Sequence, residues 1–77
     1  MKLKSLIESN VKRNWTKDEL NIAMKNEKWR GLGKFVKVLK ARKFAYGYEM
    51  LILTASGEEV RTTEYFENLE KMYNENK

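Results

Sequence analysis

Apolar residues recur at helical spacing near both ends of the chain. Near the start, one helical face at the i, i+3, i+4, i+8 spacing contains Leu3, Leu6, Ile7, Val11 and Trp15. This pattern predicts a first helix over residues 2–13. Near the end, a second apolar face contains Tyr65, Phe66, Leu69, Met72 and Tyr73. That face predicts a C-terminal helix.

A further helix begins at the clearest local signal in the sequence. Thr16 and Glu19 have the spacing of a capping box, in which each side chain accepts a hydrogen bond from the other residue's backbone amide. Trp15 before the cap and Leu20 beyond it have the spacing of a hydrophobic staple. These signals predict a helix from Lys17 to Lys28, which two following glycines then end.

The segment Lys34–Lys40 fits two patterns, because its apolar residues can be assigned either to a helical face or to an alternating strand. Its two valines and one phenylalanine, placed after two glycines, favour a strand. In a regular strand, side chains alternate between the two faces. Alternation therefore predicts Lys34 and Lys40 on one side, with Lys37 on the other.

Two clearer strands follow. Residues Tyr48–Thr54 include the run Met-Leu-Ile-Leu, which is apolar on both faces and typical of a central strand. Ser56-Gly57 then marks a tight turn, and Glu59–Thr63 alternates as a return strand. A hairpin closed tightly at this turn pairs Leu53 with Val60.

Together these elements predict the α+β fold class. The expected architecture is a small three-stranded antiparallel meander with two N-terminal helices and one C-terminal helix, in the order ααβββα. The 77 residues are predicted to form a single domain, residues 1–77. A core of this size rarely contributes more than about 3–5 kcal/mol. The chain has no cysteine and no histidine, hence no disulfide and no Cys/His zinc site to add to it.

The same two absences argue against catalysis. Histidine is the commonest general acid or base, and nucleophilic catalysis needs a base beside serine, cysteine or threonine. No such arrangement is found in the sequence, so we expect a protein that is not an enzyme and that uses no metal and no cofactor. The longest apolar run is four residues, and the start of the chain lacks the apolar region of a signal peptide. We therefore expect a soluble cytoplasmic protein that does not bind membranes.

Charge is distributed unevenly along the chain. The net charge is +5, but residues 1–43 carry thirteen Lys and Arg against four Asp and Glu, whereas residues 44–77 carry three against seven. Between positions 28 and 43 there are seven cations and no acid, namely Lys28, Arg30, Lys34, Lys37, Lys40, Arg42 and Lys43. A basic segment of this kind favours an acidic partner, nucleic acid above all.

Aromatic residues follow the basic segment at once. Phe44, Tyr46 and Tyr48 alternate and would share one face if the strand continued. Aromatic rings beside a cationic track provide stacking surfaces for nucleic-acid bases. We therefore predict a non-enzymatic nucleic-acid-binding protein, in which the seven cations contact phosphates and Tyr46 is the exposed stacking residue, whereas Phe44 and Tyr48 are expected in the core.

Three other interpretations stay open. Lysines also keep an exposed strand soluble and discourage edge-to-edge pairing. The chain could instead be a small protein-interaction module, such as a phage-type inhibitor that blocks a host protein, with contact through the first helix or through Met50 and Ile52 on an apolar outer face. In such a module the seven cations could contact an acidic protein surface. Finally, the sheet could form a homodimer.

Some segments resemble known families at the level of fold. The helix, three strands and helix predicted over residues 17–75 resemble the order in double-stranded-RNA-binding domains, although Thr63–Glu67 is acidic where that family has lysines. Trp29–Leu32 with the following basic strand resembles the three-stranded DNA-binding sheets of the AP2 type. Gly33–Val38 is similar to small SH3-like barrels, which have one strand more. Fold-level similarity does not by itself imply function.

Overall fold

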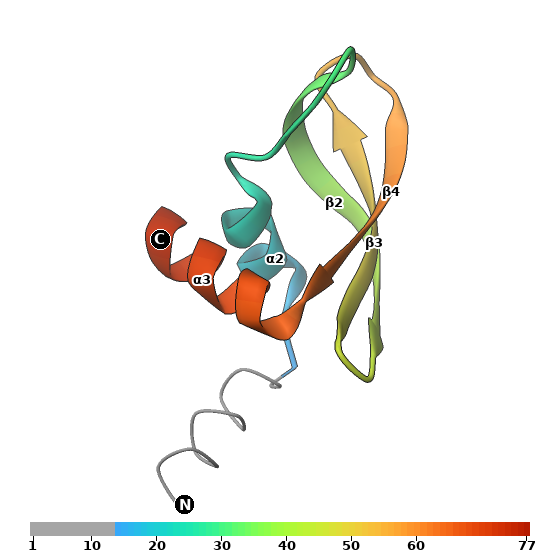
Figure 1. Cartoon of the computed structure of the whole chain (residues 1–77). Helices are drawn as coiled ribbons and strands as arrows, with labels where there is room; N and C mark the ends of the chain where they lie inside the picture. The colour runs from blue at the N-terminus through green and yellow to red at the C-terminus, as the bar shows by residue number, and fades with distance from the viewer. Residues whose placement is uncertain (1–13) are drawn as a thin grey trace, which may run out of the picture.

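The computed structural model describes residues 14–77 (Figure 1). The predicted helix over residues 2–13 lies outside the described residues. The elements, in chain order, are α2 (Lys17–Met24), β1 (Lys28–Trp29), β2 (Gly33–Phe44), β3 (Gly47–Thr54), β4 (Glu59–Tyr65) and α3 (Phe66–Asn76). The α+β class is confirmed. The sheet has four strands in the order β1-β2-β3-β4 instead of the predicted three, and every neighbouring pair is antiparallel.

The start of α2 confirms the capping box. The Glu19 amide donates to the Thr16 hydroxyl at 3.1 Å, and the Thr16 amide donates to the Glu19 carboxylate at 2.9 Å. The helix ends at Met24, four residues before the predicted end. The next residues form β1 instead, because a turn through Gly31, which has φ +80°, pairs Lys28–Trp29 with the start of β2.

Two β-bulges in β2 set the orientation of its side chains. Between Phe35 and Lys37, and again between Val38 and Lys40, β2 advances two residues while β3 advances one. Each bulge therefore places one extra residue on β2 and reverses the alternation beyond it. The predicted placement of Lys37 opposite Lys34 and Lys40 is wrong for this reason: all three lysines lie on the same face of the sheet.

The β3–β4 hairpin is also out of the predicted register by one residue. Leu53 faces Glu59 and Ile52 faces Val60, so the predicted pairing of Leu53 with Val60 is wrong. The loop between Thr54 and Glu58, which are joined by a backbone hydrogen bond, has three residues instead of the predicted two. Gly57 closes this loop with φ +89°. A shift of one residue exchanges the two faces of a strand, so this loop decides which β4 residues point outward.

The core lies between the two helices and one face of the sheet. Leu20 and Met24 of α2, Leu69 of α3 and Ile52 of β3 are fully buried there. Met50, at 2% exposure, lies beside Ile52. The predicted apolar outer face made of Met50 and Ile52 is therefore wrong, since these side chains form the inner face. In Figure 1, α2 and α3 lie against the same side of the sheet.

Neither helix found within residues 14–77 is long and apolar enough to cross a membrane.

The C-terminal end of α2 is held to α3 by hydrogen bonds from one side chain. The Asn76 amide donates to the carbonyls of Ile22 and Ala23 at 3.1 and 2.9 Å, and thus satisfies two carbonyls at the end of α2. The two helices therefore form one layer on the inner face.

Close packing of the strands at Gly47 gives a first prediction. A Cβ atom at this position would lie 2.0 Å from the Glu64 carbonyl oxygen and 2.8 Å from the Tyr65 Cα, in the last pairing row of the sheet. We expect Gly47→Ala to lower the free energy of unfolding by about 3 kcal/mol, because neither backbone can yield without breaking strand pairing. Urea denaturation measures the change. Ala45→Ser in the exposed turn is the control and should change stability by less than about 0.5 kcal/mol; an equally small effect of Gly47→Ala would contradict the close packing.

Candidate nucleic-acid interface

The face of the sheet turned away from α2 and α3, called the outer face below, has a regular arrangement of side chains. Residues that pair across the strands point to the same side. One row across β2, β3 and β4 is Lys40, Leu51 and Arg61, and the row next to it is Arg42, Glu49 and Thr63. The outer face therefore has half-buried leucine at its centre and cations on both sides.

Most of the predicted cations converge on this face. The four that follow one another along β2 are called the basic row: Lys34, Lys37, Lys40 and Arg42. Lys28 pairs with Lys34 across β1 and β2, and Arg61 adds a cation from β4. Against these six cations the outer face carries two carboxylates, Glu49 and Glu59. Its side chains therefore sum to a charge of +4.

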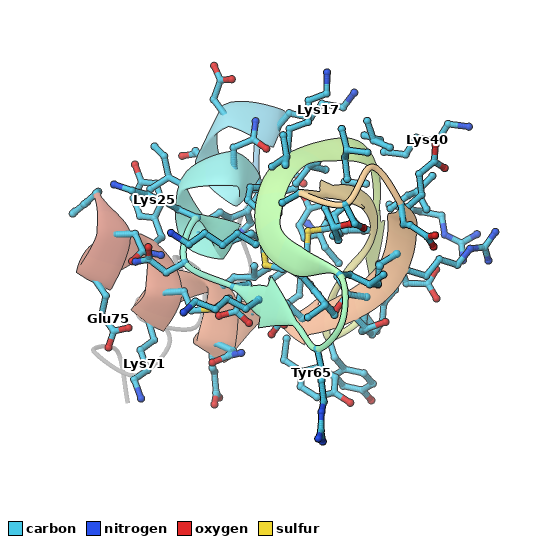
Figure 2. All side chains as sticks on the ribbon, turned by 90° about the horizontal axis from the view of Figure 1, so that it is seen from above. Lys17, Lys25, Lys40, Tyr65, Lys71 and Glu75 are labelled. Carbon is cyan, nitrogen blue, oxygen red and sulfur yellow. The ribbon has the colours of Figure 1, made fainter. Side chains whose placement is uncertain are left out.

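The helices have the opposite charge. α2 contains one lysine and two acids, and α3 contains one lysine and three acids. Figure 2 shows Lys40 extending away from the sheet on the side opposite α3, which carries Lys71 and Glu75. A protein with separated charge of this kind presents its positive face to an approaching polyanion.

The outer face is hollowed at its centre. An open groove of about 720 Å³ is lined by outer-face side chains that include Lys40, Arg42, Glu49, Leu51, Arg61 and Thr63. One ion pair crosses the groove lining: the Arg42 guanidinium lies 2.5 Å from a Glu49 carboxylate oxygen. Both side chains are largely exposed, 80% and 52%, so the pair adds little to stability and can be exchanged for another anion.

Two predicted cations lie elsewhere. Lys43 points to the inner side, where its ammonium donates to Asn14 at 2.9 Å and lies 5.8 Å from the centre of the Phe66 ring. Arg30 lies in the turn between β1 and β2. The structure thus separates Lys43 and Arg30 from the basic row, although the sequence places all of them in one run.

The aromatic residues also separate. Tyr48 is buried, and its hydroxyl accepts a hydrogen bond from the Trp15 amide at 2.9 Å, which confirms the prediction that it is a core residue. Tyr46 lies in the β2–β3 turn and is 69% exposed. Phe44, expected in the core, is half-buried on the outer face instead. The turn therefore interrupts the alternation that would have aligned all three rings.

Two outer-face residues were missed by sequence reasoning. Arg61 was assigned no role because it lies outside the basic segment, and Tyr65 was assigned to the apolar face of α3. Instead, Tyr65 ends β4 and is 62% exposed. The alternation of Glu59–Tyr65 could have placed both residues together on one face of a strand, since they are four positions apart.

Lysines that are exposed on the outer face and lysines that contact other residues of the fold should differ in stability measurements. Lys40→Gln should change the free energy of unfolding by less than about 0.5 kcal/mol, because Lys40 is exposed among other cations. Lys43→Gln is the matched comparison and should cost about 0.5–1 kcal/mol, because it loses the Phe66 and Asn14 contacts. Thermal and urea unfolding measure both. A greater loss in Lys40→Gln than in Lys43→Gln would assign Lys40 a structural role.

Residues 14–77 contain no group of three or more His, Cys, Asp or Glu side chains placed to hold a metal ion. No protein-family model, curated protein or solved structure matches the chain. What the outer face can bind is therefore inferred from its own residues and their chemistry.

Proposed function

We propose that the protein is a non-enzymatic nucleic-acid-binding protein that holds phosphate groups on the outer face of its sheet. The contacts come from the basic row, with Lys28 beside it and Arg61 across the groove. The observation that carries this proposal is the pair of β-bulges, which brings Lys34, Lys37 and Lys40 to one face. Regular alternation would have divided them between two faces.

The chemistry of the face suits phosphates. Lysine ammonium groups release condensed counterions when they contact phosphates, and an arginine can offer two parallel donors to one phosphate. Lys37 and Lys40 are exposed, so binding requires no unfolding of the sheet. The charge of opposite sign on the helices orients an approaching polyanion toward the groove.

Protection of a sheet edge accounts for only part of this arrangement. Lysines on an edge strand discourage pairing with other chains. Arg61, however, lies on β4 at the far edge of the sheet from β2, and Lys40 and Arg61 face each other across Leu51. Edge protection explains a cation on each edge strand, whereas phosphate binding also uses the groove that Lys40 and Arg61 line together.

Neutralising the basic row should weaken binding in a salt-dependent way. We expect Lys37→Gln with Lys40→Gln to reduce affinity for a labelled DNA oligonucleotide. The slope of log K against log salt should fall by roughly 1.4–1.8, because each lost contact accounts for about 0.7 with single strands and about 0.9 with duplex. Fluorescence anisotropy between 50 mM and 200 mM salt, a range that spans a large change in affinity, measures both quantities.

The control removes the same charge from the helix side. Lys25 and Lys71 are exposed lysines beside α2 and in α3 (Figure 2), and their double substitution by glutamine gives the same net charge. It should leave the slope nearly unchanged. An equal loss of affinity and slope in both double variants would show that binding depends on net charge alone and not on the basic row. Absence of binding by the unmodified protein at 50 mM salt would overturn the proposed function.

Glu49 supplies a test in the opposite direction. Its carboxylate forms an ion pair with the Arg42 guanidinium in the free protein, so a phosphate that binds Arg42 must displace the Glu49 carboxylate. We expect Glu49→Gln to bind DNA several-fold more tightly, with a slope steeper by up to about 0.9, because Arg42 becomes available for one more phosphate contact. Glu75→Gln on α3 is the matched control for net charge. Unchanged or weaker binding in Glu49→Gln would exclude Arg42 from the interface.

A further inference from the structure

Three aromatic rings lie at the end of the basic row. The last pairing row of the sheet is Phe44, Gly47 and Tyr65, and Tyr46 follows in the adjoining turn. Phe44, Tyr46 and Tyr65 are called the aromatic trio below. Phe44 is two residues beyond Arg42 on the same face, which places their Cα atoms about 7 Å apart. Cations and rings therefore form one continuous surface along β2.

The rings of the trio are arranged edge to face. The Phe44 centroid lies 6.5 Å from the centroid of Tyr46 and 6.5 Å from that of Tyr65, with interplanar angles of 77° and 64°. Because Phe44 is not stacked in parallel on either tyrosine and can contact only one side of each ring, each tyrosine keeps at least one face that Phe44 does not cover. Tyr46 and Tyr65 are 69% and 62% exposed, so solvent reaches both tyrosine side chains.

Backbone contacts hold the trio in place. Gly47 has no side chain between Phe44 and Tyr65, and its backbone lies against the Glu64 carbonyl. The Tyr46 carbonyl accepts a hydrogen bond from the Phe66 amide at 2.9 Å, which fixes the turn to the start of α3. The two tyrosines thus project from anchored backbone, and binding a flat ligand costs little conformational entropy.

From this arrangement we propose that the ligand of the outer face is single-stranded nucleic acid, with unpaired bases stacked on Tyr46 and Tyr65. Its phosphates follow the basic row, and the groove over Leu51 receives the strand between Lys40 and Arg61. This inference rests on the proposed function and adds to it the class of nucleic acid. A duplex keeps its base faces stacked on one another, so it can use the cations but not the rings.

The test compares nucleic acids that differ in the presence of bases, in strandedness or in the sugar. Anisotropy with the full chain is measured for oligo-deoxythymidine, for an abasic strand of the same length, for a duplex, and for oligo-uridine. We expect oligo-deoxythymidine to bind at least about fivefold more tightly than the abasic strand, since stacking on an aromatic ring corresponds to about 5- to 150-fold per base. The comparison of deoxythymidine with uridine separates DNA from RNA as the source of the strand.

Variants of the two tyrosines assign the effect to the rings. Tyr46→Leu with Tyr65→Leu should remove the preference over the abasic strand and keep the salt slope, because the phosphate contacts remain. Tyr46→Phe with Tyr65→Phe retains both rings and should keep the preference. Circular dichroism checks that each variant is folded. We expect all of them to fold, because both tyrosines are exposed and substitutions at exposed positions change stability little.

Failure of this inference differs from failure of the proposed function. Equal binding of the abasic strand and oligo-deoxythymidine, or tighter binding of the duplex, would overturn stacking while leaving phosphate binding intact. A preference that survives in the double leucine variant would likewise overturn the role of the tyrosines. Absence of binding to every strand at 50 mM salt would overturn both.

Discussion

The pairing of β2 with β3 is the constraint on which the rest of the structure depends. Two bulges change the spacing of inward-facing residues on β2 from two to three, so that Phe35, Val38 and Ala41 lie on the inner face. The Val38 amide, between the bulges, donates to the Asn21 side chain of α2 at 2.8 Å. This bond connects the irregular part of the strand to the helix that covers it. The inner face is thereby matched to the helix layer, and Lys34, Lys37 and Lys40 are turned to the outer face.

The free energies explain why the bulged pairing is preferred. A regular strand carrying Phe35 inward would also turn Lys37 inward, beneath the helices. Transfer of an unpaired charge from water to a protein interior costs several kcal/mol, and exposing Val38 would forfeit about 1.5–3 kcal/mol. Each bulge disrupts the ladder locally, at about 0.5–1.5 kcal/mol for a hydrogen bond lost. Burial of the apolar positions therefore outweighs the irregular backbone.

Local chemistry was sufficient to predict α2, β3 and α3 from the sequence. The capping box at Thr16, the continuous apolar run Met50–Leu53 and the helical spacing after Tyr65 each depend on neighbouring residues. The parts that failed depend on distant ones. A three-residue spacing in residues 34–40 is typical of a helix as well as of a bulged strand, so only pairing with β3 reveals the bulges. The register of β4 depends on the backbone of Gly57, and Arg61 joins the candidate site only through that register.

The convergence of the cations follows from the same energetic choice. Lys34, Lys37 and Lys40 are spaced by three, as are Phe35, Val38 and Ala41 one position later. Two bulges that turn one set to the inner face must bring the other set together on the outer face, because the two sets occupy adjacent positions throughout. Mutual repulsion of three lysines opposes this arrangement only weakly, since exposed charges are screened by water and salt. Core burial thus assembles a cationic surface that no attraction among its own residues would form, and a polyanion is the kind of ligand that relieves the repulsion left in it.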